Sequence, residues 1–151
     1  MEPDPAASAA MERLEPFIGE WVMAATFPSG PAGGTGRAVF EWALGRQFLI
    51  QRSEVPGAPD SIEIMGFDSA RQSYRQHYFD SRGIARLYAM DFSDGVWTLL
   101  RDTPDFTPLA FAHRFTGTFS ADGRRINGRW ETSQDGCAWA LDFHLSYTKV
   151  R

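Results

Sequence analysis

The chain has 151 residues, the length of one ordinary domain. Hydrophobic residues make up 43% of it and aromatic residues 14%, which is enough apolar mass for a core and excludes a largely disordered chain. The 15 Lys and Arg residues against 19 Asp and Glu residues give a net charge of -4, which disfavours nucleic-acid binding, and the single Cys137 excludes an internal disulfide.

One helix is predicted, near the start of the chain. Asp4 suits the N-cap and Pro5 the first helical position, and good helix formers continue to Leu14, after which Pro16 ends the helix. We interpret 1–10 as a tail with the start of this helix, and 11–151 as a single β domain.

Beyond the helix, segments rich in Val, Ile, Thr and aromatic residues recur about every ten residues, a spacing typical of all-β proteins. The predicted strands are 20–27, 37–43, 47–55, 61–67, 73–79, 84–92, 96–102, 109–120, 124–134 and 137–148.

Three Asp-Gly pairs, at 94–95, 122–123 and 135–136, predict two-residue hairpin turns, because both central residues of such turns need a positive φ. The resulting cross-strand pairs are Phe92–Trp97, Met90–Leu99, Tyr88–Arg101, Phe119–Ile126, Phe115–Trp130, His113–Thr132, Thr132–Trp139, Trp130–Leu141 and Ile126–Leu145. In this register His144 lies opposite Asn127.

This register separates two faces of the sheet. The apolar face holds aromatic and aliphatic residues, including Phe115, Trp130, Leu141 and Phe143. The other face places Arg114 opposite Glu131 and Arg129 opposite Asp142, as on a solvated surface. With only one short helix to cover it, the sheet must cover itself. We therefore predict an all-β fold, a single antiparallel up-and-down β-barrel of about ten strands, with a two-sheet sandwich as the alternative.

The start of the first strand resembles a known group. Leu14, Phe17 and the tripeptide Gly19-Glu20-Trp21 are similar to the Gly-x-Trp opening of the calycin (lipocalin-like) barrels. In that group a basic residue of the last strand packs across the Trp, and the resemblance implies Lys149 or Arg151 for this role.

Further segments extend the resemblance over roughly 11–149, so that 11–151 is interpreted as a calycin-like β-barrel domain. They resemble a bacterial family of lipocalin-like proteins that lacks an agreed activity, so they imply a fold and little about function. The segments are Phe40-Glu41-Trp42-x-Leu44-Gly45, Gly66-Phe67-Asp68, Tyr78-Phe79-Asp80-Ser81 and Gly128-x-Trp130-Glu131.

The strand count also resembles the nitrobindins, which are haem-binding barrels that hold haem through a His near the end of the chain. His144 is the residue that this resemblance would assign. The hairpin register, however, puts His144 on the outer face. The Gly-rich, Tyr-Pro segment that follows the first Trp of nitrobindins is also missing after Trp21. We therefore expect a surface histidine and no haem, metal or other cofactor.

Polar residues at apolar-face positions are the candidates for a site. His113 shares a face with aromatic residues, Tyr88 and Arg101 face each other, and Arg52 and Glu54 share the parity of apolar neighbours. These residues either satisfy one another or line a pocket. As a set we interpret them as a pocket, whose ligand-binding residues are Phe40, Trp42, Arg52, Glu54, Tyr78, Tyr88, Trp97, Arg101, His113, Trp130, Trp139 and Phe143.

The leading hypothesis is a barrel that binds a small hydrophobic or partly acidic metabolite, with Arg101 and His113 toward its polar group. The loop Thr103–Pro108 is a candidate lid through Phe106, or an ordinary connection. A rival is a cofactor-independent cyclase, isomerase or hydratase, with Glu54 or His113 as acid/base and Tyr88 or Arg101 as electrophile. A third interpretation is a barrel filled by its own side chains.

The expected partner is a small molecule, with neither nucleic acid nor a membrane involved and a homodimer left open. No apolar run approaches the roughly 20 residues of a membrane span. The acidic segment Met1–Pro5 lacks the apolar region of a signal peptide. We therefore expect a cytoplasmic protein.

Overall fold

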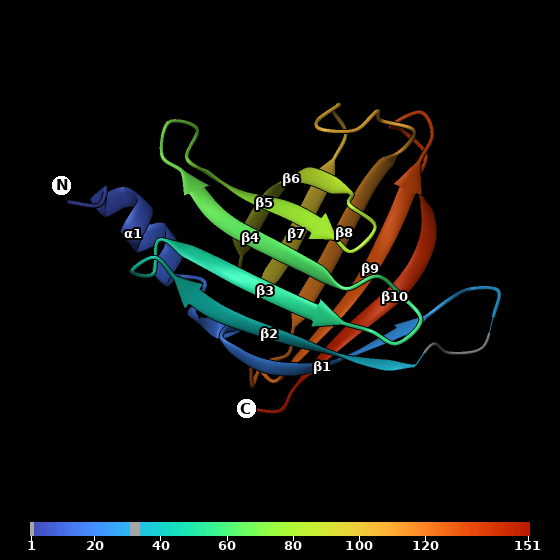
Figure 1. The fold of residues 1–151 in the computed structure, drawn as a ribbon, viewed down its shortest axis with the longest axis horizontal. Helices are drawn as coiled ribbons and strands as arrows, with labels where there is room; N and C mark the ends of the chain where they lie inside the picture. The colour runs from blue at the N-terminus through green and yellow to red at the C-terminus, as the bar shows by residue number, and fades with distance from the viewer. Residues whose placement is uncertain (1, 31–33) are drawn as a thin grey trace.

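The computed structural model describes residues 2–30 and 34–151, and within them the chain forms a closed barrel of ten antiparallel strands with a short N-terminal helix (Figure 1). Each strand pairs with its neighbour in sequence, and β1 pairs with β10 to close the barrel. The predicted up-and-down barrel is confirmed, and the two-sheet sandwich is excluded. Across the described ranges, no helix combines the length and apolar character that crossing a membrane requires.

The observed elements follow the predicted order, and most strand ends lie within a few residues of prediction. They are α1 (Pro5–Glu12), the 3-10 helix Glu15–Phe17, β1 (Gly19–Thr26), β2 (Thr35–Ala43), β3 (Phe48–Glu54), β4 (Ser61–Asp68), β5 (Ser73–Asp80), β6 (Ala85–Ser93), β7 (Val96–Arg101), β8 (Ala112–Phe119), β9 (Arg125–Ser133) and β10 (Ala140–Lys149).

The helix starts as predicted and ends earlier. Asp4 caps α1, its Oδ1 accepting a hydrogen bond from the Ala6 N–H at 3.0 Å, and Pro5 is the first helical residue. The helix ends at Glu12, because Pro16 has no N–H to donate to the Glu12 carbonyl. The chain continues as the 3-10 turn, which brings Phe17 to the barrel.

Phe17 closes one end of the barrel. It is fully buried, and its ring lies 5.0 to 5.5 Å from four other aromatic rings. Those rings belong to Phe40, Phe92, Trp97 and Phe119, and together with Phe17 they form one aromatic cluster. Burying an aromatic side chain of this kind contributes about 1.5–3 kcal/mol. This cluster therefore fills one end of the barrel, and the cavity described below lies away from Phe17.

The Gly-x-Trp segment has a physical explanation. Gly19 has a φ of +135°, and a Cβ at this position would collide with the backbone oxygen of Arg151. Two residues later, the buried Trp21 donates its indole N–H to the Phe17 carbonyl at 2.9 Å. The Lys149 ammonium lies 5.3 Å from the Trp21 ring, so the basic residue implied by the resemblance is Lys149.

The first two Asp-Gly hairpins have the predicted register. The ladder between β6 and β7 ends at Ala89–Leu100, one residue short of the predicted Tyr88–Arg101 pair. The confirmed pairs are Phe92–Trp97, Met90–Leu99, Phe119–Ile126, Phe115–Trp130 and His113–Thr132.

The third hairpin does not have the predicted register. Asp135 Oδ1 accepts hydrogen bonds from the Cys137 and Ala138 N–H groups at 2.8 and 2.9 Å, which builds a wider turn than two residues. A β-bulge between Leu141 and Phe143 then shifts the register again. The predicted pairs Thr132–Trp139, Trp130–Leu141, Ile126–Leu145 and Asn127–His144 are therefore wrong, and the observed pairs include Thr132–Ala140, Trp130–Phe143, Ile126–Tyr147 and Arg129–His144.

The wide turn and the bulge together change the faces of two residues. Leu141, predicted inside, lies opposite Glu131 with 40% of its surface exposed. Asp142, predicted to pair with Arg129 on the outer face, instead lies beside His113. Phe143 packs against the barrel core as predicted, and His144 is exposed on the outside as predicted.

The parity of β3 is the second error. Leu49, Gln51 and Ser53 are buried, whereas Arg52 and Glu54 are exposed. The prediction failed because the outward residues of β3 to β5 are themselves apolar, with Phe48, Ile62 and Phe79 among the exposed hydrophobic side chains. Arg52 instead forms an ion pair with Glu41 on the surface.

Candidate functional site

The end of the barrel away from Phe17 holds a cavity of about 190 Å³. A dry cavity of about 150 Å³ accommodates benzene, so this one has room for a single substituted ring. Its two walls differ in chemistry. The polar wall comes from strands β3 to β5 and consists of Gln51, Ser53, Ser61, Glu63, Gln76 and Tyr78. The aromatic wall comes from strands β7 to β10 and consists of Trp97, Leu99, His113, Phe115, Trp130, Phe143, Leu145 and Tyr147.

Two buried side chains of the polar wall, Glu63 and Gln76, each have a hydrogen-bonding atom without a partner in the described part of the chain. Glu63 is 6% exposed, and its Oε1 accepts a hydrogen bond from the Ser61 hydroxyl at 2.7 Å. Glu63 Oε2, like Oε1 of the 3% exposed Gln76, has no partner among the residues that the structure describes. An unsatisfied buried polar atom costs about 1–3 kcal/mol, so both atoms are candidate contacts for a bound molecule.

Burial controls the charge of Glu63. Removal from water raises the pKa of its carboxyl to about 8, and the Ser61 hydrogen bond only partly offsets this effect. The side chain is therefore mainly protonated at neutral pH and can donate a hydrogen bond as well as accept one. A neutral carboxylic acid at the side of a small cavity is a feature of ligand and catalytic sites.

Glu63 was missed by sequence reasoning, which selected Glu54. The residues on either side of it, Ile62 and Ile64, are apolar, a pattern that favours a solvent-facing position for Glu63. In the barrel Glu63 lies opposite Gln51 and shares its inward parity with Met65. A correct parity for β3 would have found it, because the partner of Gln51 across the ladder must face the same way.

Gln51 and Tyr147 connect the polar wall to β10. The Gln51 amide N–H donates to the Ser53 hydroxyl at 2.9 Å and to the Tyr147 hydroxyl at 3.3 Å. Burial raises the pKa of Tyr147 well above its ordinary value, so its hydroxyl keeps its proton. This network holds Gln51, Ser53 and Tyr147 together in the cavity wall beside Glu63.

His113 is the main polar group of the aromatic wall. Its ring stacks on Trp130 with centroids 4.2 Å apart, and its Nδ1 lies 3.4 Å from the Tyr88 hydroxyl. Burial, together with the positive charges of Arg86 and Arg101, lowers the pKa of His113 to about 4. His113 is therefore neutral at pH 7, with Asp142 Oδ2 3.5 Å from its Nε2.

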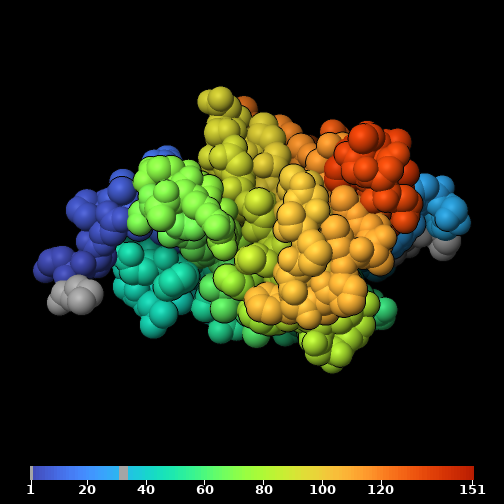
Figure 2. All heavy atoms as spheres, turned by 90° about the horizontal axis from the view of Figure 1, so that it is seen from above, coloured from blue at the N-terminus to red at the C-terminus, as the bar shows by residue number. Residues whose placement is uncertain are grey.

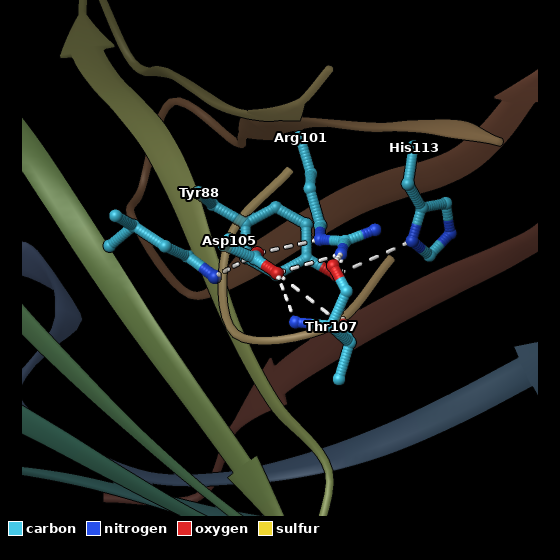
Figure 3. A network of polar contacts seen from close by, with 6 residues as sticks. Tyr88, Arg101, Asp105, Thr107 and His113 are labelled. Atoms are coloured by element: carbon cyan, nitrogen blue, oxygen red, sulfur yellow. Dashed lines mark hydrogen bonds and ion pairs between the residues drawn. The ribbon is translucent and has the colours of Figure 1, made fainter. Parts of the chain in front are cut away.

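Arg101 does not reach the cavity. Its guanidinium, on a residue that is 5% exposed, makes two hydrogen bonds to Asp105, from Nε to Oδ2 at 2.7 Å and from Nη2 to Oδ1 at 2.8 Å (Figure 3). Asp105 also accepts from the backbone N–H of Leu87, and Nη2 donates to the Thr107 hydroxyl. The Arg101 guanidinium holds the pKa of Asp105 well below its usual range.

The Arg101–Asp105 pair fastens the loop between β7 and β8 to the side of the barrel. Phe106 is 62% exposed and lies near His77, on the outer face of β5. Figure 2 shows this segment, in orange, against the yellow-green region of β5 and β6. The hypothesis of a lid in which Phe106 folds over the mouth does not match this arrangement.

Half of the predicted ligand-binding residues line the cavity. The six that do so are Tyr78, Tyr88, Trp97, His113, Trp130 and Phe143. These residues give the cavity its aromatic surface, and His113 lies within it.

The other six lie elsewhere, each for a local reason. Phe40 is part of the aromatic cluster around Phe17, and Trp42 donates its indole N–H to Glu15 at 3.2 Å. Trp139 lies under the Arg114 guanidinium, 4.0 Å from it, because the wide turn moves it off the ladder. Arg52 and Glu54 face outward, and Arg101 is held by Asp105.

The residues present do not fit haem. His144 is exposed on the outer face, and the histidine that does line the cavity, His113, is stacked on Trp130 and flanked by Tyr88 and Asp142. A cavity of about 190 Å³ holds one small ring and not a four-pyrrole macrocycle.

Comparisons with known proteins support the fold. No family model matches the chain, and a search of curated proteins gives no match. Among solved structures, the crystal structure of Rv2717c from M. tuberculosis is similar over 99% of this chain and 100% of that chain, with a TM-score of 0.61 and 15% identity. A likeness at this identity supports a barrel fold and leaves the calycin assignment as a resemblance.

Proposed function

We propose that the protein binds a compact, partly apolar small molecule inside the barrel. The observation that carries this proposal is the cavity itself, which has an aromatic wall facing a polar wall with two buried, unpartnered oxygen atoms, on Glu63 and Gln76. A cavity that mixes aromatic surface with a few convergent polar groups is the usual design of a small-molecule site. The earlier expectation of an acidic ligand held by Arg101 is replaced, because Asp105 already neutralises that guanidinium.

The test is a screen of single-ring compounds against the wild type and a variant with a filled cavity. Ser53 is buried in the cavity wall, so Ser53→Phe fills the space. The neighbouring Arg52 is exposed on the other face, so Arg52→Phe is the matched control. Ligands that raise the melting temperature of the wild type and of Arg52→Phe, and not of a folded Ser53→Phe, support the proposal. Equal shifts in all three proteins would place binding outside the barrel.

Acid–base catalysis is the second candidate, favoured by one specific observation. A neutral carboxylic acid, Glu63, and a neutral imidazole, His113, line the same small cavity. Such a pair can protonate and deprotonate a carbonyl compound, as an isomerase requires. Exchange of carbon-bound hydrogen in D2O, followed by NMR on compounds found in the screen, distinguishes catalysis from binding, since a pure binding protein leaves these signals unchanged.

A further inference from the structure

We infer that the ligand of this cavity is a neutral ring that carries a hydrogen-bond acceptor and an adjacent donor on one edge, as a cyclic amide does, and that Glu63 and Gln76 recognise that edge. The inference rests on the proposed function and specifies the chemistry of its ligand.

The first step is the placement of the two side chains. Glu63 lies opposite Tyr78 on β5, and Gln76 precedes Tyr78 by two residues on the same strand. Glu63 and Gln76 are therefore diagonal neighbours on one face of the sheet, with Cα atoms about 7–8 Å apart. Side chains at this separation can reach two adjacent atoms of a single ligand.

The second step is the hydrogen-bonding role of each unused atom. Glu63 Oε1 already accepts from the Ser61 hydroxyl, so a neutral carboxyl that carries its proton on Oε2 can donate a hydrogen bond to a ligand. Gln76 Oε1 can only accept. A ligand that satisfies both must offer an acceptor to Glu63 and a donor to Gln76, which is the pattern of a carbonyl next to an N–H.

The third step concerns charge. A carboxylate or phosphate ligand would need a cation near Glu63, and Arg101 is committed to Asp105. Arg86 lines the cavity at the mouth, near the start of β6, where its guanidinium lies over the Tyr78 ring at 5.9 Å. The inner part of the cavity around Glu63 and Gln76 therefore suits a neutral ligand, while an acid could only be held at the mouth.

The fourth step concerns shape. Trp97, Phe115 and Trp130 line the side of the cavity that faces the polar wall. The centroid of the Phe115 ring lies 4.9 Å from that of Trp97 and 5.1 Å from that of Trp130. Aromatic surfaces at this spacing pack against a flat ring. A flat ring on this wall would present one edge to β4 and β5, where the two polar atoms lie.

The test compares four probes of similar size by isothermal titration. They are 2-pyridone, which has the adjacent carbonyl and N–H, N-methyl-2-pyridone, which lacks the donor, toluene, which lacks both, and benzoate, which is an anion. We expect 2-pyridone to bind at least tenfold tighter than each of the other three. In Gln76→Met the preference for 2-pyridone over its N-methyl analogue should disappear.

The pH dependence of binding tests the role of Glu63. The other titratable or charged groups that line the cavity are Tyr78, Tyr88, Tyr147, His113 and Arg86. Burial raises the pKa values of the three tyrosines and lowers that of His113 to about 4, so none of these four groups changes charge between pH 6 and 9. Binding of 2-pyridone to the wild type should weaken above pH 8. Glu63→Gln, which keeps a neutral donor, should bind equally well across this range.

The outcomes separate this inference from the proposed function. If toluene and benzoate bind the cavity as tightly as 2-pyridone, the protein binds small molecules but the inference about their polar edge is overturned. Preferential binding of benzoate that is lost in Arg86→Met would overturn it in favour of an acid held at the mouth. If no probe binds and none of the single-ring compounds is sensitive to Ser53→Phe, both the inference and the proposed function fail.

Discussion

Replacing Glu63 by Gln should remove a large pH dependence from the stability of the protein. The pKa of the Glu63 carboxyl is about 8 in the folded protein, against an ordinary value of 4.5. The folded state thus holds this proton more tightly than the unfolded state, so its contribution to stability is fully present below pH 4.5 and is lost as the pH rises to 8. The two pKa values differ by about 3.5, and one pKa unit corresponds to about 1.4 kcal/mol, so the contribution of this proton to stability is about 5 kcal/mol.

The assay is urea unfolding at intervals from pH 4.5 to 9, with the wild type, Glu63→Gln and Glu54→Gln measured side by side. The free energy of unfolding of the wild type should fall relative to Glu63→Gln by about 1.4 kcal/mol for each pH unit up to pH 8 and then level off. Glu54 is an exposed carboxylate on the outer face, so Glu54→Gln should follow the wild type. Parallel curves for the wild type and Glu63→Gln would refute the reasoning, since they would mean that water or a cation already compensates the buried carboxylate.

Three further predictions concern other parts of the barrel. Arg101→Met should lower the free energy of unfolding by about 3–5 kcal/mol in urea titrations, because it leaves the Asp105 carboxylate buried without a partner. The double variant with Asp105→Leu should recover much of the loss, and equal destabilisation by the single and double variants would contradict this reasoning. Gly128→Ala should lower the free energy of unfolding by about 1–3 kcal/mol, because its Cβ would lie 2.5 Å from the Phe115 ring. Adding Phe115→Leu should restore part of this stability, and a double variant whose loss equals the sum of the two single losses would refute the proposed clash. Titration with ferric haem should give the same Soret spectrum for the wild type and His144→Ala, because His144 is exposed on the outer face, and a spectral difference between them would show that His144 is a ligand.

The strands could be predicted because their signals are local. Asp94-Gly95 and Asp122-Gly123 set the register of their hairpins, and alternation extended that register along β6 to β9. The same dipeptide at Asp135-Gly136 misled the prediction, since the Asp135 side chain binds two backbone N–H groups and widens the turn. Whether an Asp makes a turn through its backbone or through its side chain depends on the loop as a whole.

The site could be predicted only in its aromatic half. His113 and Trp130 lie in strands that alternate cleanly between apolar and polar residues, so their inward parity was evident. Alternation is ambiguous where both faces of a strand are apolar, and the exposed Ile62 beside the buried Glu63 is such a case. Arg101 shows a different limit. Its inward parity was correct, but its partner Asp105 comes from a loop, and the conformation of a loop does not follow from strand periodicity.

The seam between β1 and β10 has a consequence for how the chain is made. The pairing of Trp21 with Lys149 joins segments that are almost a full chain length apart. During synthesis the first nine strands can form only an open sheet, in which β1 and β9 each have an unpaired edge. Such edges recruit other strands, including those of a second nascent chain. Until β10 is available, the β1 edge therefore lacks the partner that covers it in the finished barrel.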